Sequence, residues 1–152
     1  MHVTDMHRPF FMQHTDPVYR KTINKGKQMG DISKHFSRHE FACKSERCCG
    51  ASAPVDGRLI LALEEFRAQV GEPLYISSGF RCLTHNRLVG SSDTSQHAKG
   101  YAADILCVPN MSISTMASIA ESIHAFNQGG IGQYPSFLHL DVRLGSPARW
   151  KR

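Results

Sequence analysis

The sequence predicts an α+β domain in which a small antiparallel sheet is flanked by helices. Residues 59–70 have the apolar period of a helix, and residues 137–143 alternate between apolar and polar side chains, as a strand buried on one face does. The connections between the predicted strands are too short for parallel βαβ units throughout. With 152 residues, the chain is long enough to bury a hydrophobic core as one domain.

The folded domain is predicted to comprise residues 31–152. Residues 1–30 contain Pro9, Pro17 and three histidines but no sustained apolar period. We therefore expect an N-terminal extension over residues 1–30 that does no chemistry.

Two helices are predicted before the first strand. Over residues 31–41, apolar and histidine side chains recur at helix spacing. A loop rich in small residues follows over residues 44–54. The second helix is expected to begin after Asp56, a favourable N-cap, and to run through residues 59–70 until Gly71, which suits the position after a helix.

The middle of the chain is predicted to contain two strands joined by a long irregular loop. The strands are expected over residues 74–78 and 101–107. Residues 82–100 are rich in glycine and serine, which is typical of a loop, and long ordered loops tend to be functional. Arg81 comes directly after the first strand, which is a usual place for a functional side chain.

A further helix is predicted over residues 112–127, closed by Gly129 and Gly130, and the last strand over residues 137–143. Side chains alternate along a strand. Three apolar side chains of this strand therefore point to one face, and His139, Asp141 and Arg143 point to the other. This strand thus has one face directed at the core and an opposite face able to bind a metal.

Composition and charge exclude several classes of protein. The hydrophobic content of 41% is that of an ordinary soluble protein, and no apolar run approaches the roughly 20 residues of a membrane span. The net charge of +5 comes from scattered lysines and arginines without a nucleic-acid-binding motif, so we expect no nucleic acid partner. The first residues lack the apolar stretch of a secretory signal, so we expect synthesis in the cytoplasm without a signal peptide.

The sequence contains five cysteines, an odd number that cannot pair completely within one chain. Cys43, Cys48 and Cys49 cluster in the sequence. Together with Cys82 they can form a disulfide or a structural metal site, or they can be buried as small apolar side chains. The spacing contains no C-x-x-C pair, and all three alternatives stay open.

Three side chains are predicted to bind a catalytic metal ion. Catalytic zinc usually takes three protein ligands from His, Asp, Glu or Cys and keeps one position for water. His97 lies in the long loop, Asp104 in the following strand and His139 in the last strand. Two strands and a tethered loop can bring the three together, and Gly100 lets the chain turn between the first two.

Four segments resemble a known enzyme family. Residues 95–104, SQHAKGYAAD, resemble the S-x-H-x-x-G-x-A-x-D signature of zinc D-Ala-D-Ala carboxypeptidases and L-alanyl-D-glutamate endopeptidases, the peptidase family M15 of subfamily A type. Residues 77–81, SSGFR, resemble its S-G-[YF]-R element, and residues 86–90, NRLVG, its N-x-x-V-G segment. Residues 137–141, FLHLD, resemble the terminal H-x-D strand of one branch.

The resemblance implies a Hedgehog/DD-peptidase-like fold with a zinc site on one face of the sheet. By this resemblance the zinc ligands are His97, Asp104 and His139. Arg81 would bind substrate or stabilise the oxyanion of the tetrahedral intermediate. Ser95 and Gln96 would hold the peptide or carboxylate groups of the substrate.

One position departs from the family pattern. Many members carry Glu or Asp three residues before the last ligand as a general base, whereas this sequence has Ser136. Asp141 is the candidate base because it shares a strand face with His139. The alternative role for Asp141 is to orient a ligand histidine.

These residues predict a zinc metallopeptidase that hydrolyses bacterial peptidoglycan as a carboxypeptidase or an endopeptidase, comparable to a phage or prophage endolysin. Its expected partners are peptidoglycan stem peptides, and we expect a monomer. The alternative is a zinc-stabilised module of a cell-wall-binding or phage structural protein, which keeps the fold but does not catalyse.

Overall fold

The computed structural model describes residues 30–45 and 54–152. It confirms the predicted α+β fold. The elements in chain order are η1 (Arg38–Phe41), α2 (Gly57–Val70), β1 (Ile76–Ser78), α3 (Leu83–Leu88), η2 (His97–Lys99), β2 (Ala102–Leu106), α4 (Ile113–Glu121), α5 (His124–Asn127), β3 (Gly130–Gln133), β4 (Phe137–Asp141) and β5 (Ala148–Lys151).

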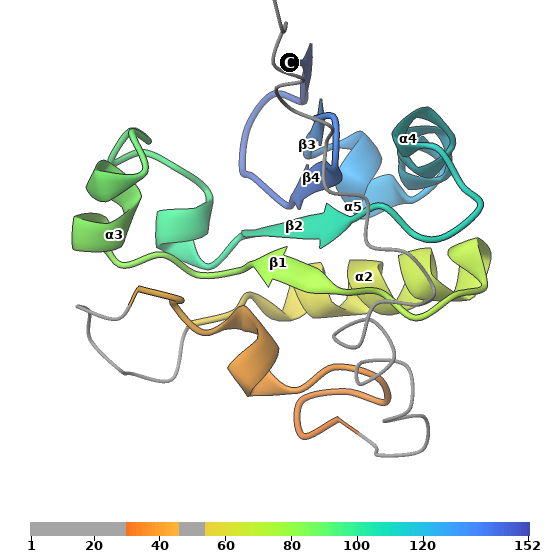
Figure 1. The fold of residues 1–152 in the computed structure, drawn as a ribbon, viewed down its shortest axis with the longest axis horizontal. Helices are drawn as coiled ribbons and strands as arrows, with labels where there is room; N and C mark the ends of the chain where they lie inside the picture. Colours follow the sequence, from red (N-terminus) through yellow and green to blue (C-terminus); the bar gives the residue numbers. More distant parts are fainter. Residues whose placement is uncertain (1–29, 46–53) are drawn as a thin grey trace, which may run out of the picture.

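The five strands form a single sheet in the order β1-β2-β4-β3-β5. All neighbouring pairs are antiparallel except β3 and β5, which run parallel. Figure 1 shows β1 and β2 across the middle of the molecule, with α3 beyond the end where β2 begins and α4 near the end where it finishes. The segment that joins β1 to β2 therefore lies at one end of the sheet.

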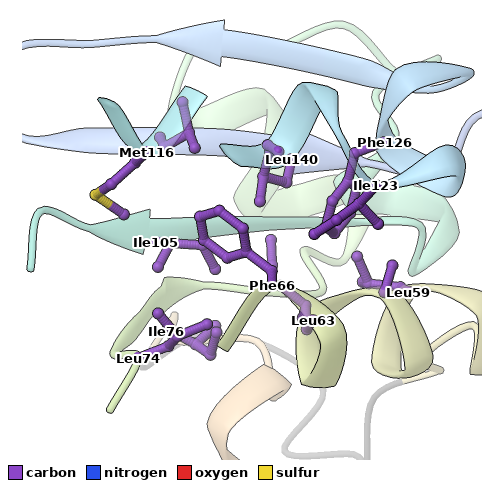
Figure 2. Packing of buried hydrophobic residues seen from close by; sticks show 14 of the residues in the cluster. Leu59, Leu63, Phe66, Leu74, Ile76, Ile105, Met116, Ile123, Phe126 and Leu140 are labelled. Atoms are coloured by element: carbon purple, nitrogen blue, oxygen red, sulfur yellow. The ribbon is translucent and has the colours of Figure 1, made fainter. Parts of the chain in front are cut away.

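The longest helix, α2, has the ends that the sequence predicts. Asp56 accepts a hydrogen bond at 2.8 Å from the backbone N–H of Arg58, and Gly71 has the left-handed φ of 78°. Figure 2 shows Leu59, Leu63 and Phe66 extending from α2 toward the sheet. The apolar stripe of α2 is thus buried against the strands.

The hydrophobic core lies between one face of the sheet and the helices α2, α4 and α5. The rings of Phe66 and Phe126 meet edge to face, with centroids 6.3 Å apart (Figure 2). The sheet contributes alternate residues of its three central strands: Ala103, Ile105, Ile131, Leu138 and Leu140. The residues between them on β2 and β4 face the other side, which is where Asp104 and His139 lie.

The predicted helix over residues 31–41 is wrong, since only Arg38–Phe41 forms one turn of 3-10 helix. The carboxylate of Glu64 accepts hydrogen bonds from the hydroxyl of Ser33 at 2.6 Å and from the backbone N–H of His35 at 2.8 Å. These bonds hold the segment in bends along α2. A side chain distant in sequence thus overrides the local helical period.

The predicted irregular loop over residues 82–100 contains two short helices, α3 and η2. The sulfur of Cys82 caps α3 by accepting from the backbone N–H of His85 at 3.4 Å. Within α3, Asn86 is fully buried, and its amide donates to the carbonyl of Ser92 at 2.6 Å. The segment is therefore fixed by its own polar side chains, which periodicity does not reveal.

The predicted helix over residues 112–127 is broken, and the strands β3 and β5 were not predicted. Ile123 has an extended backbone (φ −93°, ψ 116°) and is buried, so α4 stops at Glu121 and α5 starts anew. Gly130 and Gly132 give β3 the composition of a turn, and β5 is polar for a strand. β3 forms because β4 offers it a partner edge, and β5 then pairs with the other edge of β3.

Parts of the sequence predictions lie outside the described residues. These are the extension up to residue 29, most of the loop over residues 44–54, and the two cysteines Cys48 and Cys49. In the part of the chain that the structure describes, no helix is both long and apolar enough to cross a bilayer.

Candidate metal centre

One row of residues crosses all five strands on the face opposite the core. The register pairs Ser78 with Asp104, Asp104 with His139, His139 with Gly132, and Gly132 with Trp150. Paired residues on neighbouring strands present their side chains to the same face. Asp104 and His139 are therefore adjacent at the centre of the sheet.

His97 reaches the same place from η2, just before β2. Gly100 ends η2 with the left-handed φ of 73°, and a Cβ there would lie 2.3 Å from the carbonyl oxygen of Pro54. The backbone N–H of Arg81 donates to the carbonyl of His97 at 3.2 Å. This close packing fixes the turn that directs the His97 imidazole toward Asp104.

Three atoms converge between these side chains: Nε2 of His97, Oδ1 of Asp104 and Nδ1 of His139. The two nitrogens lie 3.2 Å apart, and they lie 3.1 Å and 2.9 Å from Oδ1. All three side chains are buried. In the described residues, this is the one group of three or more metal-binding side chains whose ligand atoms are this close.

The outer partners of the two histidines determine where their protons lie. His97 Nδ1 is 2.6 Å from the carbonyl oxygen of Gly79, and His139 Nε2 is 2.9 Å from a carboxylate oxygen of Asp141. Carbonyl and carboxylate oxygens only accept, so both nitrogens must donate. An imidazole that carries no second proton then directs the lone pair of its other nitrogen at the centre. Two lone pairs and a carboxylate oxygen face one another, which is favourable around a cation.

The arrangement fits a zinc ion. Zinc binds imidazole nitrogen and carboxylate oxygen at about 2.0–2.2 Å, which places tetrahedral ligand atoms about 3.3 Å apart. The observed separations of 2.9–3.2 Å are within a few tenths of an ångström of this value. Both donor types and their spacing are therefore suitable.

Arg81 holds the second oxygen of Asp104. Its Nη2 donates to Oδ2 of Asp104 at 3.0 Å, and its Nε donates to the hydroxyl of Ser78 at 3.0 Å. Burial raises the pKa of Asp104, but hydrogen bonds and charge from His139 and His97 outweigh it and hold that pKa well below its usual range. Asp104 is thus ionised, and its Oδ1 stays directed at the centre.

Asp141 lies behind His139, on the side of the ring away from Asp104. It is fully buried, and it accepts from Arg143 through both carboxylate oxygens and from the backbone N–H of Gly130 at 3.0 Å. Burial raises its pKa, but the bonds from Arg143 and His139 more than offset this effect and lower it strongly. Asp141 is therefore an ionised acceptor directed at His139.

The pKa of His139 is raised. Burial lowers it, but hydrogen bonds to Asp104 and Asp141 on opposite sides of the ring outweigh burial. In the absence of a cation, a proton can occupy the position on Nδ1 that a metal would take. Protons and metal ions thus compete for the same lone pair.

A groove of about 870 Å³ runs over the three side chains. Arg81, Ser95 and Gln96, the side chains for which the sequence predicts substrate binding, are among its lining residues. Ser95 also accepts from the backbone N–H of His97 at 3.2 Å. Asp141 is not among the lining residues, because His139 and Arg143 cover it.

Trp150 and the glycines of β3 were not predicted as parts of this site. A Cβ on Gly132 would lie 2.2 Å from the indole of Trp150, and a Cβ on Gly130 would lie 2.2 Å from the carboxylate of Asp141. Glycine inside a strand indicates the close approach of another group. The Gly-Ile-Gly sequence at residues 130–132 was the signal that could have shown where Trp150 and Asp141 pack against β3.

A comparison with known families agrees with this geometry. The sequence model of one family, described as Peptidase M15, matches residues 34–141, which is well over half of the chain. The match includes the whole His97, Asp104 and His139 group. No curated protein matches the chain.

Proposed function

The chain belongs to the Peptidase M15 family, and from this premise we propose that it is a zinc-dependent peptidase of bacterial peptidoglycan. The zinc ligands in this proposal are His97, Asp104 and His139. A bound zinc ion supplies the Lewis acidity that polarises a peptide carbonyl and activates water. Side chains in and around the groove bind the substrate and orient the zinc ligands.

The observation that carries the proposal is the orientation of the two histidines. Gly79 and Asp141 each occupy one ring nitrogen from outside, so the other nitrogens present lone pairs to Asp104. When neither histidine carries a second proton, three acceptor atoms lie within 3.2 Å of one another, which is the arrangement that a divalent cation stabilises.

Arg81 is proposed to combine two tasks. Its guanidinium fixes Asp104 by the bond at 3.0 Å, and it also lines the groove next to the centre. A guanidinium has five donors, so it can bind a substrate carbonyl or carboxylate while it holds Asp104. Ser95 and Gln96 line the same side and are proposed to bind the peptide backbone of the substrate.

For Asp141 we propose the orienting role rather than that of general base. Its carboxylate is separated from the groove by the ring of His139 and is bound to Arg143 by two hydrogen bonds at 2.9 Å and 2.6 Å. A carboxylate behind a ligand histidine fixes the ring and raises its basicity as a ligand. Asp141 thus acts through His139.

The groove supports endopeptidase rather than carboxypeptidase activity. Residues that line it lie on both sides of the centre, from Ser77 on β1 to Trp150 on β5. A peptide that extends on both sides of its scissile bond fits such a groove, whereas a carboxypeptidase needs a closed end beside the centre.

Three measurements on the whole chain test the proposal. We expect about one zinc per chain by elemental analysis, release of peptides from isolated cell walls, and loss of that release with a chelator. Mass spectrometry of the released muropeptides identifies the bond. His97→Ala should lose both zinc and activity, whereas His124→Ala, at an exposed histidine of α5, should keep both.

A non-catalytic module is the second candidate. The observation in its favour is that, within the described part of the groove, Asp104 is the sole carboxylate lining it. Zinc at one per chain with wall binding but no released peptide would establish this alternative. Absence of zinc from the wild-type protein prepared with zinc would refute both candidates.

A further inference from the structure

The two halves of the groove differ in chemistry. The half beside β1 is lined by basic side chains (Lys44, Arg81 and His85), by the amide of Gln96 and by the hydroxyl side chains of Ser77, Ser78, Ser91, Ser92, Thr94 and Ser95. The half beside β3 and β5 is lined by the three aromatic side chains Tyr134, Phe137 and Trp150. His139 lies between the two halves, so a substrate at the centre meets a polar surface on one side and aromatic rings on the other.

The indole of Trp150 lies against β3 at Gly132, where the absence of a side chain leaves room for the ring. It occupies the space that a Cβ on Gly132 would fill, 2.2 Å from ring carbon Cε2. Its centroid lies 5.0 Å from that of the His139 ring, at an interplanar angle of 48°. The ring is therefore next to the metal-binding face, and it is only partly buried.

Two further aromatic rings extend and fix this surface. Tyr134 and Phe137 stack with centroids 4.2 Å apart at an angle of 13°. The hydroxyl of Tyr134 accepts a hydrogen bond from the indole N–H of Trp150 at 3.1 Å. The three rings thus form one connected unit, which we call the aromatic wall.

Two arginines, Arg143 and Arg152, line the groove beside the aromatic wall, and the charge of Arg143 is compensated. The guanidinium of Arg143 lies 5.6 Å from the Trp150 centroid, but both carboxylate oxygens of Asp141 bind it. A neutral, rigid aromatic surface binds apolar groups with little loss of side-chain entropy.

We propose that the aromatic wall is the subsite for an apolar side chain of the peptide on one side of the scissile bond, and that Trp150 is its specificity-determining residue. This inference rests on the proposed peptidase function. The ligand is a peptide residue with an apolar side chain, such as an alanine of the stem peptide. The hydroxyl-lined half binds the polar backbone on the other side of the bond.

Tryptophan fluorescence reports on this subsite because Trp150 is the only tryptophan of the chain. The probe is the synthetic stem pentapeptide L-Ala–γ-D-Glu–L-Lys–D-Ala–D-Ala, mixed rapidly with zinc-loaded protein so that emission is read before turnover. We expect a saturable change in tryptophan emission. The same peptide with aspartate in place of the alanines should need about tenfold higher concentration for half of the change.

Two variants test the subsite by kinetics. Trp150→Ala removes the ring, and Gly132→Ala displaces it while it stays in the chain. In both, the KM for the pentapeptide, or for the muropeptide that the wild type cleaves, should rise about tenfold. Zinc content and kcat should stay within about twofold. Tyr75→Leu, at a partly exposed aromatic residue outside the groove, is the matched control and should leave KM unchanged.

The outcomes separate this inference from the proposed function. Active zinc enzyme with unchanged KM in both variants and no change in emission would overturn the inference and leave the peptidase intact. A loss of zinc in Trp150→Ala with unchanged KM would also overturn it, because the ring would then only position His139. Wild-type protein without hydrolysis refutes the peptidase, and the emission titration still decides whether the wall binds the peptide.

Discussion

Asp141 Oδ2 lies 2.9 Å from His139 Nε2, on the side of the imidazole that faces away from the metal-binding centre. This contact makes Nε2 a donor and leaves Nδ1 as the only nitrogen of His139 that can bind a metal. The carboxylate itself is fixed by Arg143 and Gly130. The geometry of the centre is therefore set partly by Asp141 and Gly130, which do not line the groove.

The first prediction concerns Asp141→Asn. An amide is neutral and can present its NH₂ group to His139, so the ring loses its fixed orientation. We expect zinc affinity to fall by about 10–100-fold, as is typical when such a partner is lost. Competition with a chromophoric chelator measures it. Asp93→Asn, at an exposed aspartate bound to Arg87, is the control. Intact zinc affinity with a large fall in kcat would instead make Asp141 the general base.

The second prediction concerns the removal of the metal. A ligand that binds only the folded state stabilises it by RT ln(1 + [L]/Kd), which is about 2.7 kcal/mol at a zinc concentration of 100 times Kd. Chelator should therefore lower the Tm of the wild type, and added zinc should restore it. His97→Ala should have a Tm that neither treatment changes. A wild-type Tm that changes neither with chelator nor with added zinc would contradict a zinc site at His97 in the folded state.

The sequence was informative where a local rule acts alone. Asp56 and Gly71 mark the ends of α2 because capping depends on a few adjacent residues. The alternation at residues 137–141 places Leu138 and His139 on opposite faces of β4, because the strand period is a backbone property.

The remaining features depend on contacts between distant residues. Glu64 bends the segment around His35, and Trp150 covers Gly132 from a strand 18 positions later in the sequence (150 − 132). The position of Asp141 behind His139 depends on which way the ring is turned, which strand alternation does not specify. These relationships can be seen only in the tertiary structure.

The third prediction uses two glycines with the same backbone conformation. Gly100 has φ +73° and Gly71 has φ +78°, but a Cβ on Gly100 would meet Pro54 at 2.3 Å, whereas a Cβ on Gly71 meets nothing within 4 Å. Gly71→Ala should cost about 1 kcal/mol for the left-handed backbone alone. Gly100→Ala should cost clearly more, about 2–4 kcal/mol, because the backbone must also move. Urea unfolding measures both; equal losses would show that the contact with Pro54 yields easily.

The fourth prediction concerns pH and Glu64. Burial raises the pKa of this carboxyl, but hydrogen bonds from Ser33 and His35 outweigh burial and lower it. A lowered folded pKa stabilises the fold above the unfolded pKa of about 4.3. That contribution is lost as the pH falls through the lowered folded value. Glu64→Gln should therefore be less stable than the wild type by about 1–2 kcal/mol at pH 7. The difference should shrink below pH of about 4. Urea unfolding at several pH values measures it, with Glu65→Gln, at the exposed neighbour, as the control. A difference that stayed constant down to acid pH would show that the hydrogen bonds, and not the charge of Glu64, hold the segment against α2.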